Sequence, residues 1–525
     1  MAPNTDYHHV FVPFPDIFEL SGRDVFENLQ AKPGNKNLVV VAMPMVTWLD
    51  DLKEGHNSVG AADTLQYLKE AQRRTQPQKD GTAICFISER LDIAFIDDSN
   101  LKDEGFIAPL EEKVRLLWQA QDDDGRPILM TNRERDHIRF RTQGMRVDDP
   151  HFLQVKSDIV DKGIITGSHE LLAKLYQSKD HSINLETALS FFDEEGLLRP
   201  NQFIRFTGDK DYVYARVMGD PIWNSNHSRM TGIDNLRVKL LDKSEYGKKL
   251  IIGNAHQENI LGISPRDMEQ YLAVQYGLLN PDVSLFFLCG SQGSGKTLLG
   301  YVCAVDQVLI YEQKERIKRM NNPQSKAGFF KQIILLKPNE VLGGKRRDVG
   351  ALPGSLYDKL KPHLAPYIDA HRESELGRLF PFDEMLRHPH FDNDFGPKRS
   401  DAASNTKING CAYLPKYAEV VEMTYSGFMR GRSFRDAIVL LDEAQNFTPY
   451  EVKTILERTG EGCKVVVMGD PKQVDNPFCS REINGLTHAI QQYLPKPYVG
   501  LVTLSRNYRS QMSDDAREWK VFSQS

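Results

Sequence analysis

The sequence predicts an α/β protein with two large units and a smaller β module between them. Three observations predict this. Apolar strand-like runs alternate with helical patterns through about the first 150 residues. Short alternating runs follow between residues 201 and 241, and an apolar strand enters a glycine loop and a helix between residues 283 and 311. Strands that alternate with helices favour a mostly parallel sheet, so we expect regions 1–152, 153–258 and 259–525.

The composition is that of an ordinary globular chain, with 525 residues, 40% hydrophobic and 26% charged. A net charge of −6 provides no overall basic field, so a nucleic-acid partner would need a local patch. The six cysteines show no C-x-x-C spacing, which suits reduced thiols. The first residues are polar and no apolar run is long enough to span a membrane. We therefore expect a soluble, cytoplasmic protein without a membrane partner.

The first region combines predicted strands and helices with acidic residues near the strand ends. The strands are His9–Pro13, Asn37–Met43, Thr82–Ile87 and Pro127–Thr131. The helices are Trp48–Leu52, Ala61–Arg73, Leu110–Gln121 and Arg133–Gln143. The acidic residues are Asp16, Asp50, Asp51, Glu111, Glu112, Glu134 and Asp136.

The first region resembles a PIN domain. The resemblance lies in the order of three features: a first strand with a short acid turn, the run V-V-V-x-x-P-x-V-x-x-L-D-D-L-K, and the run P-I-L-M-T-N. The resemblance implies a ribonuclease fold in which carboxylates hold Mg²⁺ or Mn²⁺, here Asp16, Asp50 and Glu111. Two positions depart from the family. Phe14-Pro15-Asp16 replaces an aspartate-threonine-asparagine triplet, and Arg133 stands where an acid is usual.

These departures leave two alternatives for the first region. A hard divalent ion needs several oxygen ligands, and the cation of Arg133 would oppose it. The region is then either a degenerate PIN fold kept for RNA contact or assembly, or an active nuclease. The active alternative would use Asp16, Asp50, Glu111 or Glu112, and Glu134.

The second region reads as a connector that contains a small β module. Helical patterns at Asp158–Gln177 and Ile183–Phe192 precede the short runs Asn201–Phe206, Tyr212–Met218 and Leu236–Leu241. Its aromatic residues could stack on nucleic-acid bases or fill a core; they are Phe203, Phe206, Tyr212 and Tyr214.

The third region begins with a phosphate-binding pattern, G-x-x-x-x-G-K-T, placed between a strand and a helix. Its glycines let backbone N–H groups curl around phosphates at a helix N-terminus. Lys296 can neutralise the β- and γ-phosphates, and the Thr297 hydroxyl can ligate Mg²⁺. We expect ATP and Mg²⁺ to be bound by Gly290, Ser291, Gln292, Gly293, Ser294, Gly295, Lys296 and Thr297. Gln270, about twenty residues upstream, could offer its amide to adenine or be a solvent-facing helix residue.

Three further stretches supply candidate catalytic groups. A five-residue apolar strand ends in Asp442, placed to hold Mg²⁺, and Glu443, placed to polarise the attacking water. Gln473, after the strand Lys464–Met468, could sense the γ-phosphate. Arg506 and Arg509 follow the last predicted strand and could stabilise transition-state charge.

Other basic and polar stretches have weaker assignments. The basic loop Lys345–Gly354 could contact RNA phosphates or be a solvated surface. Residues 371–416 read as an insertion, in which Arg387–Asp394 could ligate a metal or form an ordinary loop.

A set of five motifs resembles the PhoH family of ATPases. The motifs are G-S-Q-G-S-G-K-T, L-P-G, M-R-G-R-S-F, L-L-D-E-A-Q-N and G-D-P-K-Q. With the first region, the chain is similar to PIN–PhoH fusion proteins. The resemblance implies a RecA-like core with helicase-type motifs, RNA (single-stranded) as substrate, and a multimeric ring. A second nucleotide core does not fit after the last predicted strand. We therefore expect a homo-oligomer in which an arginine finger completes the nucleotide cleft, in cis or in trans. The candidates are Arg430, Arg432, Arg506 and Arg509.

Three function classes remain open at this point. The first is an ATP-dependent RNA motor or unwinding enzyme, with or without a nuclease that receives its substrate from it. The second is an ATP-gated RNA-binding or assembly protein without unwinding. The third is a kinase that uses the same phosphate loop, against which Gln473 and Gln270 argue.

Overall fold

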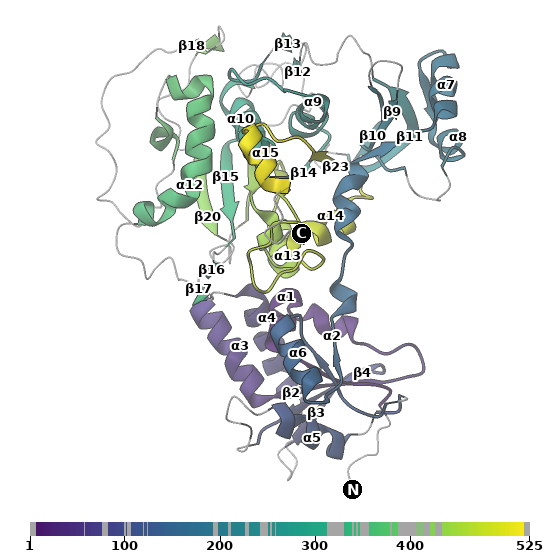
Figure 1. The fold of residues 1–525 in the computed structure, drawn as a ribbon, viewed down its shortest axis with the longest axis vertical. Helices are drawn as coiled ribbons and strands as arrows, with labels where there is room; N and C mark the ends of the chain where they lie inside the picture. The colour runs from purple at the N-terminus through teal and green to yellow at the C-terminus, as the bar shows by residue number, and fades with distance from the viewer. Residues whose placement is uncertain are drawn as a thin grey trace, which may run out of the picture.

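Three large β-sheets, of five or six strands each, follow one another among the described residues of the computed structural model (Figure 1). We name them the N-terminal sheet (residues 10–148), the middle sheet (164–240) and the C-terminal sheet (285–504). The structure describes residues 7–518 with the exception of 57, 76–81, 99–100, 102–106, 119, 123, 193–197, 208–211, 226–229, 242–249, 253–254, 258, 312–329, 339–340, 343–344, 347–355, 379–380, 387–406, 409–410, 413–419 and 426–432.

The N-terminal sheet is parallel except at one edge. Its strands lie in the spatial order β3 (Thr82–Ser88), β4 (Leu91–Ile96), β2 (Asn37–Ala42), β1 (Val10–Pro13), β5 (Ile128–Met130) and β6 (Val147–Asp148). Strand β3 pairs antiparallel with β4, whereas the other pairings are parallel. All four strands predicted for this region are present. The sequence prediction missed β4 and β6.

Helices cover both faces of the N-terminal sheet. They are α1 (Pro15–Ser21), α2 (Asp24–Asn28), α3 (Met43–His56), α4 (Val59–Gln72), α5 (Ile107–Leu117) and α6 (Glu134–Thr142). In β2, Val39 and Val41 pack in a core with α1, α2 and α4, while Leu38 and Val40 pack with α5 and α6. This is the alternation that a strand buried on both faces requires.

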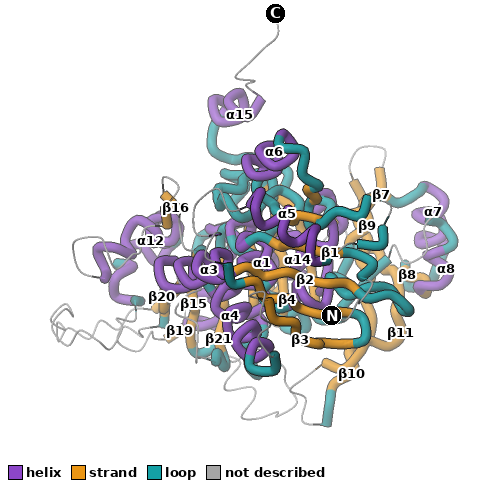
Figure 2. The backbone as a smooth tube through the Cα atoms, turned by 90° about the horizontal axis from the view of Figure 1, so that it is seen from below, coloured by secondary structure: helices purple, strands orange, loops and turns teal. Residues whose placement is uncertain are grey.

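The middle sheet is a compact β module, as the sequence predicted. Its order is β7 (Ile164–Thr166), β9 (Phe203–Thr207), β10 (Tyr212–Trp223), β11 (Met230–Leu240) and β8 (Ser182–Asn184). Helices α7 (His169–Gln177) and α8 (Leu185–Leu189) pack on one side of these strands (Figure 2). Of its aromatic candidates, Phe203, Phe206 and Tyr214 are buried. Tyr212 is exposed and lies under the Arg205 guanidinium, 4.9 Å from the ring centroid.

The C-terminal sheet is parallel throughout. Its order is β20 (Val421–Tyr425), β15 (Gln332–Lys337), β21 (Ala437–Leu441), β22 (Lys464–Gly469), β14 (Leu285–Gly290) and β23 (Val499–Leu504). Alternate residues of β14 enter different cores: Phe286 and Leu288 on one face, Leu285 and Phe287 on the other. Strand β22 lies between β14 and β21. The carboxyl ends of all these strands therefore meet at one edge, where doubly wound folds bind ligands.

Helices also cover both faces of the C-terminal sheet. They are α9 (Met268–Ala273), α10 (Lys296–Val305), α12 (Leu356–Glu373), α13 (Pro449–Leu456) and α14 (Gly485–Tyr493). The last helix, α15 (Gln511–Glu518), follows β23, and none of its described residues belongs to either core. Helices α10 and α12 pack on one face, and α13 and α14 on the other. The expected insertion at 371–416 begins inside α12, and its Leu376, Phe382 and Met385 are buried in the same core. That part of the expected insertion is therefore packed in the core.

Shorter elements complete the described structure. They are the hairpins β12 (Leu250–Ile252) with β13 (Ala255–Gln257), β16 (Val341–Leu342) with β17 (Lys345–Arg346), and β18 (Lys407–Ile408) with β19 (Cys411–Ala412). The other short elements are the 3₁₀ helices η2 (His151–Leu153), η3 (Ser157–Gly163), η8 (Glu375–Arg378), η9 (Phe382–Met385) and η11 (Ala444–Asn446), and the π-helices η5 (Val274–Leu278) and η6 (Asp306–Tyr311). Among the described helices, none is both long and apolar enough to cross a bilayer.

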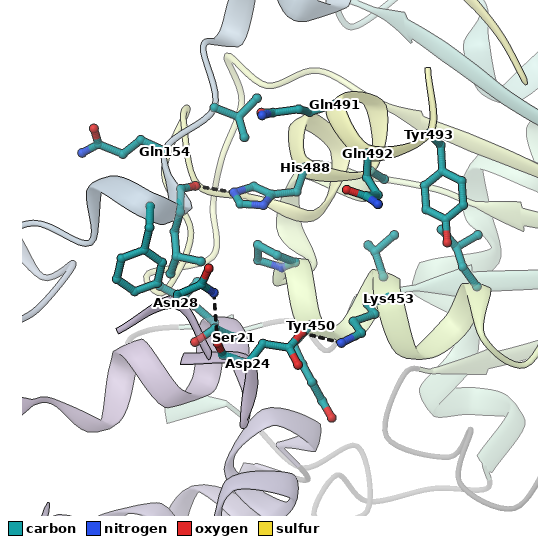
Figure 3. A pocket seen from close by; sticks show the side chains of 18 of the residues that line it. Ser21, Asp24, Asn28, Gln154, Tyr450, Lys453, His488, Gln491, Gln492 and Tyr493 are labelled. Atoms are coloured by element: carbon teal, nitrogen blue, oxygen red, sulfur yellow. Dashed lines mark hydrogen bonds and ion pairs between the residues drawn. The ribbon is translucent and has the colours of Figure 1, made fainter. Parts of the chain in front are cut away.

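The units around the N-terminal and C-terminal sheets are in direct contact, and Figure 1 shows α13 above α1. The Tyr450 ring of α13 packs against Gly22, where an added Cβ would lie 2.6 Å from Cε2. Lys453 forms an ion pair with Asp24 across this boundary. A cavity of about 510 Å³ lies beside these contacts (Figure 3), and on its other side the His488 ring is hydrogen-bonded to the Leu153 carbonyl.

A buried lysine supports the start of β22. The Lys464 ammonium donates to the carbonyls of Gly277 and Asn280, both at 2.8 Å, and burial lowers its pKa to about 7. An unfolded lysine titrates near ~10.4, so between these pH values the unfolded chain binds more protons than the folded chain. This lysine therefore makes the free energy of unfolding increase with pH from about 7 to about 10.

We expect Lys464→Met to remove that increase. Urea unfolding of the wild type and the variant at pH 7 and at pH 9.5 checks this, because other titrating groups cancel in the difference between the two proteins. An equal increase in both proteins would contradict the assignment.

Candidate nucleotide site

The glycine loop between β14 and α10 has the backbone that a phosphate cradle requires. Gly290, Gly293 and Gly295 all have positive φ, at 146°, 81° and 93°. An added Cβ would lie 2.6 Å from the Leu504 carbonyl oxygen at Gly290, and 2.2 Å from Asn507 Oδ1 at Gly293. Side chains cannot be accommodated there, so the loop needs glycine for space as well as conformation.

Lys296 points back into this loop. Its Nζ donates to the carbonyls of Gly290, at 2.6 Å, and Ser291, at 3.0 Å. Burial lowers the pKa of the ammonium, while the carboxylates of Glu443 and Asp442 oppose that shift. Lys296 and Asp442 thus lie close enough for their charges to interact, and their joint role in nucleotide binding stays a prediction.

The loop also fits an anion by its hydrogen-bonding groups. The buried Ser291 hydroxyl has no hydrogen-bond partner among the residues that the structure describes. Ser294 is buried and donates to the Ser291 carbonyl at 2.7 Å, whereas Gln292 is exposed. Thr297 is partly exposed in the first turn of α10. A phosphate oxygen would satisfy the Ser291 hydroxyl and the N-terminal N–H groups of α10.

Two acids follow β21 on the facing strand end. Asp442 is 2% exposed, accepts a hydrogen bond from the Glu443 amide at 3.1 Å, and lies 3.5 Å from Lys337 Nζ. Glu443 has left-handed backbone, with φ 54°, an uncommon conformation for a residue with a side chain. This turn directs consecutive carboxylates into one site. Asp442 and Thr297 carry the oxygen ligands that Mg²⁺ prefers.

The Glu443 carboxyl has a perturbed pKa. Burial raises the pKa, the neighbouring Asp442 raises it further, and the Gln445 amide and the cations of Lys296 and Lys337 lower it. A carboxylate whose pKa lies above its ordinary value is a stronger proton acceptor, which suits a general base.

Gln445 connects Glu443 to the loop that follows β22. Its side-chain nitrogen donates to Glu443 Oε2 at 2.7 Å and to the Gln473 carbonyl at 2.9 Å. Its side-chain oxygen accepts from the Asp470 amide at 3.0 Å. Gln445 is fully buried, and this one amide links the segments that follow the two strands.

We expect Gln445→Leu to move the acid limb of the turnover–pH profile to higher pH. The change removes a hydrogen bond that lowers the pKa of Glu443, so the carboxylate is protonated at a higher pH than in the wild type. Measuring kcat against pH for this variant and for Gln491→Leu, an exposed position of α14, checks this. Superimposable acid limbs would refute the role of Gln445.

Gln473 contacts the site through its backbone. Its amide donates to the Asp470 carbonyl at 3.0 Å and its carbonyl accepts from Gln445, while the residue itself is exposed. A role for its side chain in sensing phosphate remains a prediction.

Gln270 is not a solvent-facing residue. It is 4% exposed, its Nε2 donates to the Ser294 carbonyl at 2.9 Å, and its Oε1 accepts from the Arg266 amide at 2.8 Å. Both ends of the amide are therefore engaged with the protein. Reading adenine would require Gln270 to exchange one of these bonds for a base contact.

The segment after β23 lies against the phosphate loop. The Tyr508 amide donates to the Gly293 carbonyl at 3.0 Å, and its hydroxyl donates to Asp267. Arg509 lies over Gly293, since an added Cβ there would be 2.9 Å from its Cγ. Arg506 and Arg509 are both exposed, and Arg509 adjoins the loop of its own chain. Arg430 and Arg432 lie outside the described residues, as do most of Lys345–Gly354 and all of Arg387–Asp394.

The structure does not bring the three N-terminal carboxylates together. Asp16 is buried, and its Oδ2 accepts from Thr131 Oγ1 at 3.1 Å and the Asn132 amide at 2.6 Å. Asp50 is exposed on α3 and pairs with Lys53, and Glu111 is partly exposed on α5. Over the described ranges, no group of three or more His, Cys, Asp or Glu residues could hold a metal ion.

Sequence reasoning missed several residues of the nucleotide site. They are Lys337, Tyr367, Gln445, Asp470 and Asn507. Tyr367 lies beside Asp442 and Glu443, whose carboxylates, together with burial, raise the pKa of its phenol. The L-L-D-E-A-Q-N pattern contained Gln445, but spacing alone gave no sign that its amide reaches Asp470, 25 residues away.

Comparison with known proteins shows which family the residues around the site resemble. Residues 262–517 match the family model described as PhoH-like protein. The chain is 28% identical to Protein PhoH2 of Bacillus subtilis over 407 residues, which is 77% of this chain and 74% of that protein. It is 30% identical to a PhoH-like protein of Bacillus subtilis, over 51% of this chain and 61% of that protein. It is 33% identical to a PhoH-like protein of Mycobacterium tuberculosis (strain H37Rv), over 39% of this chain and 44% of that protein.

The matched residues contain every element of the nucleotide site, from Gln270 to Arg509. PhoH family proteins are in general ATP-binding and ATP-hydrolysing, which agrees with the phosphate loop, the paired acids and the Gln445 contact. Residues 262–517 of this chain are thus similar to the PhoH family and carry a P-loop-type core; we call them the PhoH domain.

Proposed function

We propose that this chain hydrolyses ATP at the site between β14 and β21, and that hydrolysis is coupled to single-stranded RNA. The observation that carries the first part is the meeting of Lys296 with Asp442 and Glu443 at one sheet edge. Mg²⁺ held by Thr297 and Asp442 would neutralise phosphate charge when bound.

The chain's own residues divide the work of hydrolysis. The glycine loop and Lys296 hold the β- and γ-phosphates. Glu443, with its raised pKa, orients the attacking water and accepts its proton. Gln445 fixes that carboxylate and links it to the loop that contains Gln473. Movement of this loop on loss of the γ-phosphate would transmit a conformational change from the nucleotide site to bound RNA.

The coupling to RNA is supported by the helicase-type motif set and by the exposed Gln473, Arg506 and Arg509 at the same edge. ATP turnover of the purified protein, with and without single-stranded RNA, tests it. We expect RNA to raise kcat. An assay of strand separation on a tailed duplex then distinguishes an unwinding motor from a protein that binds RNA without unwinding it. Turnover that is indifferent to RNA would refute the coupling.

A second candidate function is an ATP-gated RNA-binding or assembly protein without nuclease activity. The observation that favours it is Asp16, whose carboxylate is buried and bound to Thr131 and Asn132. Burial also raises the pKa of this carboxyl. Mn²⁺-dependent RNA cleavage, followed in the same reactions, would instead support the nuclease.

We also propose a homo-oligomer, with a ring as the closed form of a head-to-tail contact. The exposed Arg506 is the candidate finger for a neighbouring site, since Arg509 adjoins its own loop. Light scattering with ATP and RNA present should give a mass above that of one 59.8 kDa chain. A monomer under those conditions would refute the ring.

A further inference from the structure

A loop of the PhoH domain packs inside the N-terminal unit. We name residues 470–479, which follow β22, the anchor loop. Phe478 and Cys479 are buried in the core that contains α1, β2 and Met130, and Val474 packs against the same core. The anchor loop therefore belongs to both units, since it starts at the nucleotide site and ends in the N-terminal core.

The N-terminal unit holds the far end of the anchor loop through two consecutive residues. Asn132 Nδ2 donates to the Phe478 carbonyl at 3.1 Å. The Arg133 guanidinium lies between two rings, 5.1 Å from the centroid of Phe478 and 4.6 Å from that of Trp48. A guanidinium between aromatic faces is a favourable cation–π arrangement, and its planar shape suits stacking.

The near end of the anchor loop is held by the nucleotide site. Gln445 donates to the Gln473 carbonyl, and Asn446 Oδ1 accepts from the amides of Asp475, at 2.7 Å, and Asn476, at 3.2 Å. Asn476 in turn accepts from the Phe478 amide at 3.0 Å. Hydrogen bonds and the loop backbone thus connect Glu443, through Gln445 and the anchor loop, to Asn132.

We propose that Asn132 and Arg133 are positioning residues for the ATPase site. They hold the anchor loop, the anchor loop holds the Gln473 carbonyl, and that carbonyl shares the Gln445 amide with Glu443. Without the anchor, Gln445 loses a fixed partner and Glu443 its orientation. The proposal rests on the proposed ATP hydrolysis.

This role accounts for the cation at position 133, where the PIN resemblance leads one to expect an acid. An aspartate there could neither stack between Trp48 and Phe478 nor gain from the negative faces of their rings. The edge that would carry a metal in a nuclease instead receives a side chain of the PhoH domain. Arg133 is thus part of the contact between the two units.

The test uses the full-length protein with Arg133→Ala, Arg133→Lys and the matched control Arg135→Ala, an exposed arginine on the same helix. We expect Arg133→Ala to lower kcat for ATP about fivefold or more while KM changes less than about twofold, because the phosphate loop is untouched. Lysine keeps the cation and should restore part of kcat. Arg135→Ala should match the wild type.

Hydrogen exchange gives a readout independent of turnover. Arg133→Ala should speed exchange of the backbone amides in residues 470–479, and Arg135→Ala should not. An unchanged kcat in Arg133→Ala, or a lowered kcat with unchanged exchange in the anchor loop, would overturn the proposal. A wild-type protein without turnover would refute the ATPase function and with it the catalytic half of this inference. The exchange comparison would still decide whether Arg133 holds the loop.

Discussion

Replacing Lys296 with alanine should lower ATP turnover by at least about a hundredfold, the size of effect seen when one charge-stabilising donor is removed from a buried site. In the proposed site Lys296 is the cation that would face the phosphates, and burial limits how far water screens its charge. Its Nζ also donates to the Gly290 and Ser291 carbonyls, so the variant loses support for the loop itself. Nucleotide affinity should fall together with kcat.

Titration with a fluorescent ATP analogue and a steady-state turnover assay measure both effects. Lys496→Ala is the control, because this lysine is exposed and precedes β23, at the opposite end of that strand from the phosphate loop. Full turnover in Lys296→Ala would show that the cleft between β14 and β21 is not the hydrolytic site.

Replacing Glu443 with glutamine should give a protein that binds ATP and does not turn it over. The amide has nearly the shape of the carboxylate but cannot accept the proton of the attacking water, so we expect kcat to fall about 10²- to 10⁴-fold. Binding should be preserved, because Lys296 and the glycine loop remain and the charge repulsion with Asp442 is reduced.

Rapid filtration with labelled ATP, followed by separation of ATP from ADP, measures this directly. We expect the bound nucleotide to stay as ATP in Glu443→Gln and to appear as ADP in the wild type. Glu461→Gln, an exposed acid before β22, is the matched control. Unchanged hydrolysis in Glu443→Gln would assign the base to another residue.

The strands of the three sheets could largely be predicted from the sequence, because buried parallel strands are short apolar runs with recognisable ends. The strands Ala437–Leu441 and Val499–Leu504 illustrate this. Strand β20 was missed because Val-Glu-Met-Thr-Tyr is polar at alternate positions, as an edge strand can be. Helix α12 was missed because it contains two prolines, and the core it shares with Tyr301 decided its conformation.

Some residues of the candidate site could likewise be predicted from the sequence, and others could not. Gly290, Lys296, Asp442 and Glu443 could be found because each follows a buried strand in a pattern whose chemistry is local. Lys337 and Asn507 could not be found, since each lies beside its partner only after β15 and β23 take their places in the sheet. The burial of Gln270 was likewise invisible in a helix of ordinary composition.

The sequence alone determined the α/β class, the phosphate loop and the acids at its facing strand end, because these depend on spacing and on residue type within a few positions. Only the tertiary structure decided how the two large units communicate. The contacts of Asn132 and Arg133 with Phe478 join residues about 346 positions apart, and no periodicity carries information over that distance. Burial of Phe478 in the core of the other unit determines where the anchor loop ends, and thus what holds the nucleotide site in shape.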